Sequence, residues 1–279
     1  MQTKMIKLVS KNVVIYFLLI VVTIFSIFPF IWTISSSFKN DVEVIAYPPT
    51  FIPKEFTFSA FVAIFKEYNF GKYFLNSFIV ALGATLISLF VGSLAAYSFS
   101  RLRFPGDNLL LIALLGSMML PTIVLIIPIF IIFERLSLID THFGLILANC
   151  CSGVPLVAWM MRGFFSSIPG ELEDSAIVDG CSYFGAFFRI LLPISAPGLA
   201  ASAIFIFLIV WNEFIFALIF TNETAKTLPV ITSEFIGVFE ISWNRLAAAG
   251  VVTAIPILIF ILIFQKWLIS GLTQGAVKG

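Results

Sequence analysis

The chain has 279 residues, of which 60% are hydrophobic and only 11% charged, and its mean hydropathy is +1.10. A soluble globular domain is near half apolar and a quarter charged, so this composition excludes a water-soluble core and makes lipid the main solvent. The formal net charge of +1 also argues against nucleic-acid binding as a main role.

Long uncharged stretches recur along the chain, and about 20 apolar residues suffice for a helix to cross a bilayer. We therefore expect an all-α membrane protein with six transmembrane helices in one domain, residues 1–279. Prolines inside the stretches predict kinked helices. The predicted spans cover about residues 12–38, 73–100, 108–133, 143–165, 194–220 and 246–268.

Lysines at the N-terminus precede the first apolar run, as they do in a signal peptide. The run 12–38 is too long for such a peptide and no small-residue cleavage site follows, so we expect a retained helix. If both termini are cytoplasmic, that side carries nine lysines and arginines and the other side seven. This distribution predicts a multi-pass protein with cytoplasmic termini.

The second predicted span carries small residues at every fourth position. Ala84, Ser88, Gly92 and Ala96 would lie on one helix face. Such a ridge lets a second helix approach closely, and it predicts packing rather than a functional site.

Catalytic chemistry is not evident in the sequence. The single histidine, His142, is expected in a loop as an ordinary surface residue. The tail GLTQGAVKG has neither the spacing nor the strand–helix context of a phosphate-binding loop, so we expect no nucleotide site in this chain. No metal cluster or catalytic triad can be drawn from the spacing, and we expect no enzyme activity, no metal and no cofactor in this chain.

Glu213 lies late in the fifth predicted span, beside Trp211 and Asn212. An ionisable group at mid-bilayer costs roughly 2.5–3.5 kcal/mol and usually faces a pathway or a partner. Two interpretations stay open: the three residues line a translocation pathway, or Glu213 lies near the interface and reaches water.

Residues 169–193 form an acidic segment between the fourth and fifth spans. Glu171, Glu173 and Asp174 would fill the first turn of a short helix, where acids complement the helix dipole. Gly180 can end that helix in a left-handed conformation. On physical grounds the segment is either a docking element for a partner or an interfacial linker.

A second short helix is expected after Gly180. Phe184, Phe187, Phe188 and Leu191 follow helical spacing and predict one apolar face. Such a face suits packing on the bundle or into a groove of a partner.

This segment resembles the EAA loop of bacterial ABC-importer permeases, whose pattern is roughly E-A-A-x-x-D-G, about nine residues, then I-x-L-P. Residues 174–180 and 190–193 fill the two parts, with Asp174 for glutamate and Ser175 for alanine. Further strings resemble the maltose-type, second-permease branch of these carbohydrate permeases. They are SSSFK (35–39), LNSFIVA (75–81), SRLRFPG (100–106), MLPTIVLIIP (119–128), WNEFIFAL (211–218) and QKWLISGLTQGAVKG (265–279).

The resemblance implies a permease subunit of an ATP-driven sugar or oligosaccharide importer in the bacterial plasma (inner) membrane. Its partners would be a second permease, two copies of an ATP-binding subunit that hold ATP and Mg, and an extracytoplasmic solute-binding protein. The outward loop 221–245 would contact the binding protein.

The same resemblance assigns contacts with the ATPase to two places. The tail 269–279 would reach between the ATPase subunits, chiefly through Thr273, Gln274 and Gly275. The loop 171–189 would be the coupling helix, and Asp174 would take the role of the motif's glutamate, which pairs with an arginine. The implied coupling residues are Glu173, Asp174, Ala176, Asp179, Gly180, Phe184, Phe187 and Phe188.

The competing class is a self-sufficient secondary transporter or channel for a small polar solute. It would need ion-coupling acids or an inverted repeat within the spans, and only Glu213 qualifies. A membrane enzyme is disfavoured because no catalytic constellation is visible.

Overall fold

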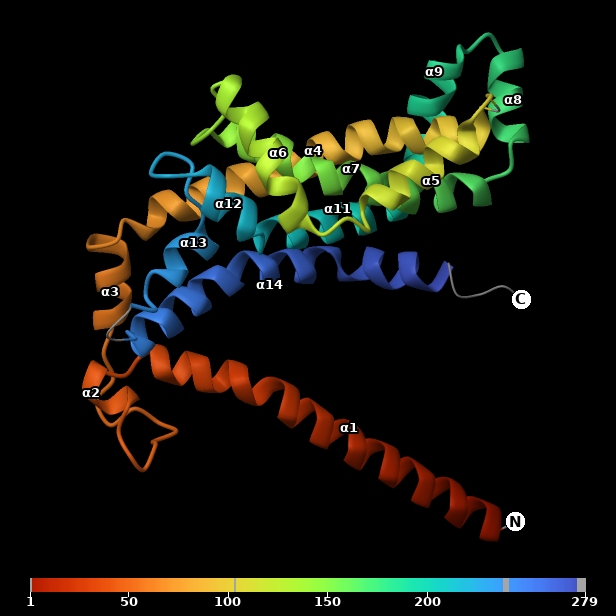
Figure 1. Cartoon of the computed structure of the whole chain (residues 1–279). Helices are drawn as coiled ribbons and strands as arrows, with labels where there is room; N and C mark the ends of the chain where they lie inside the picture. Colours follow the sequence, from red (N-terminus) through yellow and green to blue (C-terminus); the bar gives the residue numbers. More distant parts are fainter. Residues whose placement is uncertain (1, 103, 238–240, 275–279) are drawn as a thin grey trace. The chain divides into compact units, whose positions relative to one another are not determined.

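The structure is a computed structural model that describes residues 2–102, 104–237 and 241–274, with side chains from residue 12 to residue 265 of these ranges. Across these residues the chain is helical, and the only β-type pairing there is an isolated bridge between Ile236 and Ile241. The prediction of an all-α membrane protein is confirmed. Figure 1 shows the helices in chain order.

Among the described residues, four helices are long and apolar enough to cross a membrane, and two bent helix pairs raise the number to six if each pair is one span. The four are α1 (Gln2–Ser37), α4 (Phe70–Arg101), α7 (His142–Ser167) and α14 (Trp243–Gln274). One bent pair is α5 (Asp107–Ser117) with α6 (Thr122–Arg135), at 98°. The other joins residues Tyr183–Ile194 to α11 (Ala196–Trp211), at 78°.

Two expected spans are divided, the first at the bent pair α5–α6 and the second between α11 and α12. The stretch 108–133 breaks just before α6, where Pro121 is the N-cap residue. Proline disfavours helical geometry in the residue before it, so the chain turns there. The stretch 194–220 breaks after Trp211, and α12 (Ile215–Phe220) resumes the helix. Pro29, Pro128, Pro155 and Pro256 lie inside helices, as expected.

The chain divides into two compact units, which are described separately. The first unit contains Met1–Phe70 and Thr232–Ala254. It holds α1, the short helices α2 (Asp41–Val44) and α3 (Ser59–Lys66), and the beginning of α14. A cluster of aromatic rings packs within this unit. Phe38 stacks on Phe56, with ring centroids 4.4 Å apart, and contacts the rings of Phe58 and Phe61.

Glu43 organises the loop of the first unit. Its Oε1 accepts hydrogen bonds from the Thr50 hydroxyl and from the Lys54 amide, both at 2.8 Å. The hydrogen bond from the Lys54 amide is the largest influence and lowers the pKa of Glu43. Lys39, which is only 1% exposed, lies 4.7 Å from the Trp32 ring and donates to the Thr50 carbonyl. The segment between α2 and α3, residues 45–58, is thus held in place by buried charged side chains.

The second unit contains Gly71–Ile231 and Ile255–Gly279. It holds α4, α5, α6, α7, α11 and α12, together with four short elements that follow α7 and most of the short helix α13 (Leu228–Ser233). The four short elements are α8 (Glu171–Val178), α9 (Tyr183–Ala186), the π-helix η1 (Phe187–Leu191) and α10 (Leu192–Ile194).

The small-residue ridge of α4 packs against α7, as its spacing predicts. Ala84 and Ser88 are fully buried. A Cβ atom at Gly92 would lie 2.7 Å from the Val157 Cβ, and one at Gly153 would lie 2.3 Å from the Ser88 Oγ. The two helices therefore approach as closely as glycine allows.

His142 is not the ordinary surface residue that the sequence predicts. It is the first residue of α7, it is half-buried, and its Nε2 lies 2.7 Å from the Asn76 Oδ1 on α4. The Asn76 amide nitrogen donates to two backbone carbonyls, so its Oδ1 must be an acceptor and the His142 Nε2 must be the donor. The histidine thus links two helices.

Candidate functional site

The segment after α7 folds as two short helices joined at a sharp corner. Gly180 has φ +90° and follows α8. The Cys181 amide donates to the Ala176 carbonyl at 2.9 Å and the Gly180 amide donates to the Ile177 carbonyl at 3.0 Å. This is the Schellman pattern that ends a helix with a left-handed glycine. The Ser182 hydroxyl then caps α9 by accepting from the Gly185 amide at 3.1 Å.

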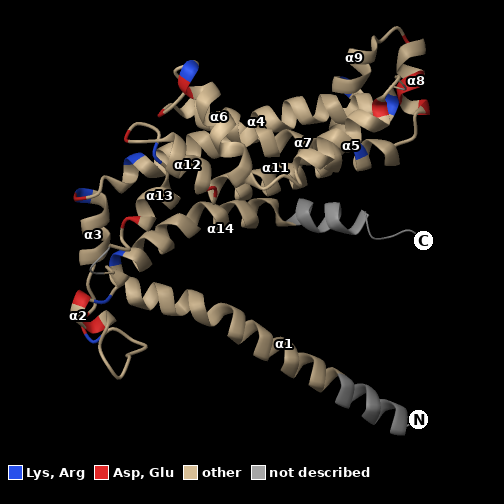
Figure 2. Cartoon of the chain, in the orientation of Figure 1, with Lys and Arg blue, Asp and Glu red and all other residues tan. Residues whose placement is uncertain are grey.

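Glu173 fixes α8 to the end of α4. Its Oε1 lies 2.5 Å from the Arg101 Nε, and the Arg101 Nη2 donates to the Ile168 carbonyl at 2.9 Å. The glutamate is only 5% exposed. Glu173 therefore belongs to the interior of the chain, while its neighbour Asp174 is exposed. Figure 2 shows acidic residues of α8 beside a basic residue.

The aromatic stripe after Gly180 does not lie on one face. Phe187 and Leu191 are 2% and 0% exposed, whereas Phe184 is 61% exposed. The α-helical spacing that predicted one stripe ends at Ala186, because η1 has a π-helical turn. Phe187 contacts Tyr97 and Phe165 and anchors the segment on the bundle.

An exposed surface remains on α8, α9 and the start of η1, and we call it the α8–α9 face. Its apolar side chains are Val178, Tyr183, Phe184 and Phe188, and its acids are Asp174 and Asp179. A cavity of about 110 Å³ opens beside Asp174, between Tyr97 and Tyr183. Such a combination of exposed rings, acids and a small cavity suits a protein partner with a basic side chain.

The residues around Glu213 do not share one surface. Trp211 is 1% exposed and packs edge-on against Phe74, with ring centroids 5.7 Å apart. Glu213 is half-buried, and its carboxylate accepts from the Phe216 amide at 2.7 Å and the Ala217 amide at 3.1 Å. It thus caps the first turn of α12. Asn212 is exposed.

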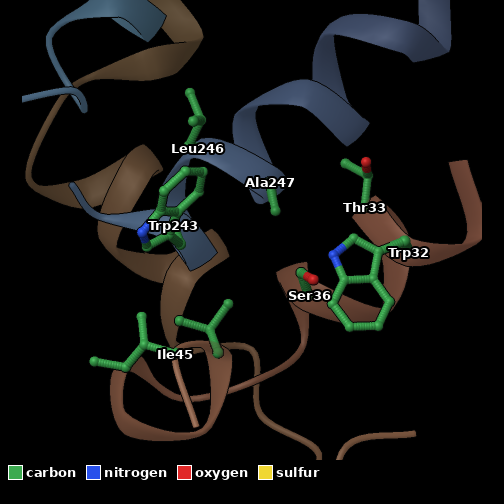
Figure 3. A pocket seen from close by; sticks show the side chains of 8 residues that line it. Trp32, Thr33, Ser36, Ile45, Trp243, Leu246 and Ala247 are labelled. Carbon is green, nitrogen blue, oxygen red and sulfur yellow. The ribbon is translucent and has the colours of Figure 1, made fainter. Parts of the chain in front are cut away.

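The first unit holds a cavity of about 380 Å³ at the end of α1 and the start of α14 (Figure 3). Trp32 and Trp243 line it, together with the buried Ser36 and aliphatic side chains. In Figure 3 the Ser36 hydroxyl lies between the two indole rings. The lining is neutral, and tryptophans at span ends are typical of a membrane–water interface.

The predicted tail contacts fall at the edge of the described chain. Thr273 and Gln274 lie in the last turn of α14, and their side chains are outside the described residues. Gly275 is itself outside them.

Kinked apolar helices with an exposed acidic helix, α8, define a polytopic membrane protein with a surface suited to a partner. Residues 88–274 match the family described as the binding-protein-dependent transport system inner membrane component. The chain belongs to this family. It is a multi-pass membrane protein.

Relatives of known role cover nearly all of the chain. The trehalose/maltose transport system permease protein MalG of Thermococcus litoralis is 37% identical, over 97% of this chain and 98% of the length of MalG. The trehalose transport system permease protein SugB of Mycobacterium tuberculosis is 38% identical over 91% of this chain and 93% of its own.

Solved structures share the fold. A chain of a bacterial ABC transporter involved in the import of the acidic polysaccharide alginate superposes with a TM-score of 0.78. That chain is 21% identical, and the match covers 91% of this chain and 95% of the other. An inward-facing chain of the MetNI methionine ABC transporter superposes with a TM-score of 0.55 at 17% identity, over 74% and 95% of the two chains.

Proposed function

We propose that this chain is one of two different permease subunits of an ATP-driven importer of sugars or oligosaccharides. It forms half of the translocation pathway and has no catalytic role of its own. Two copies of an ATP-binding subunit, which hold ATP and Mg, bind on one side of the membrane. A solute-binding protein delivers the sugar on the other side. The sugar class rests on the trehalose and maltose permeases to which the chain is similar.

The α8–α9 face is the observation that carries this proposal. The chain fixes α8 from inside through Glu173 and leaves Asp174 outside. We assign the contact with a basic side chain of the ATPase to Asp174, with Asp179 and the exposed rings Phe184 and Phe188 around it. Ala176, Gly180 and Phe187 have the internal role of holding the two helices in place.

The proposal also assigns the two sides of the membrane. With the α8–α9 face in the cytoplasm, both termini are cytoplasmic, as the distribution of lysine and arginine predicts. The start of α4 and the loop after α12 face the other side, where the segment 221–245 contacts the binding protein. Asn212, which is exposed, is the candidate of the Trp211–Glu213 group for contact with a passing sugar.

The mechanism follows from the stiffness of this attachment. ATP binding closes the ATPase dimer and moves the α8–α9 face. Because Glu173 and Phe187 join that face to α4 and α7, the helices move with it as rigid bodies. The bundle then changes the side on which its pathway is open.

Reconstituted vesicles test the proposal. The chain is assembled with its second permease, ATPase and binding protein, and uptake of labelled trehalose, maltose and longer oligosaccharides is measured. We expect uptake only with ATP on the ATPase side and binding protein on the other side. Asp174→Ala should reduce uptake and ATPase association, while Glu171→Ala, an exposed acid of the same turn, serves as the matched control.

The competing function, a self-sufficient transporter, makes the opposite prediction. It requires uptake by this chain alone, driven by an ion gradient. Its one candidate coupling acid, Glu213, has both carboxylate oxygens hydrogen-bonded to backbone amides of α12. Gradient-driven uptake without ATPase would establish this alternative and refute the importer.

A further inference from the structure

A cluster of hydrogen bonds holds the segment Phe220–Leu228 at the opposite end of α4 from Arg101. Asp140, in the corner between α6 and α7, is its centre. One carboxylate oxygen of Asp140 accepts from the amides of Asn222 and Thr224, both at 3.0 Å, and of Ala225 at 3.1 Å. The other accepts from the Thr224 amide at 3.0 Å and the Glu223 amide at 3.4 Å.

Side chains of α4 hold three carbonyls and one amide of the same segment. Lys72 donates to the Glu223 carbonyl at 2.8 Å. Asn76, which is 5% exposed, donates to the carbonyls of Thr224 and Lys226 at 2.9 and 2.8 Å. The Ser77 hydroxyl accepts from the Leu228 amide at 2.8 Å. We call this set, with Asp140, the α4–Asp140 clamp.

The clamp fixes the backbone and leaves three side chains at the surface, one of which, Thr224, also hydrogen-bonds to Asp140 through its side chain. Asn222, Glu223 and Thr224 are exposed, whereas the flanking Thr221 and Ala225 are buried. A polar tip whose backbone is already ordered loses little conformational entropy when a protein docks on it. The arrangement suits recognition of a surface that carries hydrogen-bond donors.

The clamp also connects to the α8–α9 face through the same two helices. Lys72 and Arg101 lie at opposite ends of α4, about 43 Å apart at 1.5 Å per residue. His142, joined to Asn76, begins α7, and α8 follows the end of α7. Between the two ends, Gly92 and Gly153 bring α4 and α7 into close contact. Helices α4 and α7 therefore form one stiff element. The polar tip, residues Asn222–Thr224, lies at one end of it and the α8–α9 face at the other.

We infer that Asp140 is a positioning residue that couples docking of the solute-binding protein at Asn222–Thr224 to the α8–α9 face through α4 and α7. This inference rests on the proposed function, because it takes the binding protein as the partner. Asp140 itself touches no partner. Asp140 holds residues Asn222–Thr224 against α4 and α7. A binding protein that docks on these residues therefore moves the two helices instead of bending the loop after α12.

The test measures ATP hydrolysis by the complete reconstituted complex, without and with increasing binding protein. Asp140→Ala should raise the concentration of binding protein for half-maximal stimulation by roughly tenfold and lower the ratio of stimulated to unstimulated hydrolysis, since the tip must be ordered on binding. Glu134→Gln removes one exposed acid of the same region, outside the clamp, and should match the unmodified complex.

Hydrogen exchange at the amides of residues 222–225 gives a second readout. It should rise in Asp140→Ala and stay unchanged in Glu134→Gln. If Asp140→Ala does not assemble, Asp140→Asn keeps the side-chain volume and is measured in its place. Equal half-maximal concentrations for the Asp140 variant and the unmodified complex would overturn the inference. A complex that no binding protein stimulates, even unmodified, would instead refute the proposed importer.

Discussion

Arg101 and Glu173 form an ion pair between the last residue of α4 and the first turn of α8, with 2.5 Å between the Arg101 Nε and the Glu173 Oε1. Their side chains are 17% and 7% exposed, so little water screens the pair. The same arginine donates to the Ile168 carbonyl at the end of α7. One side chain thus joins three elements at the base of the α8–α9 face.

Glu173→Gln should loosen this junction, because it leaves the Arg101 charge without its partner. Removal of one member of a fully buried pair costs about 3–5 kcal/mol, and the residual exposure here favours the lower end of that range. The unfolding temperature of the purified chain in detergent should fall by several degrees. Asp174→Asn, one residue along and exposed, should change it little. Equal unfolding temperatures for the two variants would contradict the structural role given to Glu173.

Substitutions at Gly180 should act through the backbone alone. Its φ is +90°, and no atom lies within 4 Å of the position that a Cβ would take. Gly180→Ala should therefore cost about 1–2 kcal/mol, the usual penalty for a left-handed non-glycine residue. Gly180→Pro also removes the amide that donates to the Ile177 carbonyl. We expect it to abolish ATPase association or transport while membrane insertion stays intact.

Gly170→Ala is the matched control for Gly180. Gly170 has φ −67° and also has open space around it, so alanine fits there without strain. Pull-down of the ATPase and membrane fractionation distinguish the variants. Normal uptake by Gly180→Pro would show that the corner is not needed for coupling.

Local sequence signals were sufficient for the backbone of the α8–α9 segment. The acids of its first turn and the left-handed Gly180 follow from capping rules that involve only neighbouring residues. The close packing of the small-residue ridge on α4 could also be predicted, because the spacing of its residues lies within one helix. The break at Pro121 was not placed, since a proline in an apolar run can kink a helix or end it.

Long-range pairing decided what the sequence left open. Glu173 and Asp174 are adjacent acids, and only Arg101, far away in the chain, determines which one turns inward. His142 looked like a loop residue because its partner, Asn76 on α4, is distant in the chain. The sequence did not single out Asp140, because the amides that it binds after α12 are equally distant. Hydrogen bonds of this kind leave no periodic pattern that a single sequence could reveal.

Gly92→Ala should disrupt the packing of α4 on α7. The added Cβ would lie 2.7 Å from the Val157 Cβ and 3.0 Å from the Val154 carbonyl oxygen, and neither atom can rotate away. Overpacking of this kind costs about 1–3 kcal/mol, so the unfolding temperature should fall by a few degrees. Gly163→Ala, on α7 with open space around it, should leave the temperature unchanged or raise it. A Gly92→Ala protein as stable as Gly163→Ala would mean that the helices are farther apart than described.

Asp140 should make stability depend on pH in the acid range. Burial alone would raise the pKa of its carboxyl, but the amides of Ala225, Thr224 and Asn222 outweigh burial and lower the pKa from 3.8 to about 2. The stabilising contribution, about 2 kcal/mol, is complete above pH 4 and is lost as the pH falls from about 4 towards 2. Asp140→Asn should therefore be less stable than the unmodified chain at pH 6.5, and the difference should shrink at pH 3. Unfolding temperatures at the two pH values measure it, with Glu134→Gln giving the background effect of removing one carboxylate. A difference that stays constant between the two pH values would show that the ionised carboxylate does not hold the segment Asn222–Ala225.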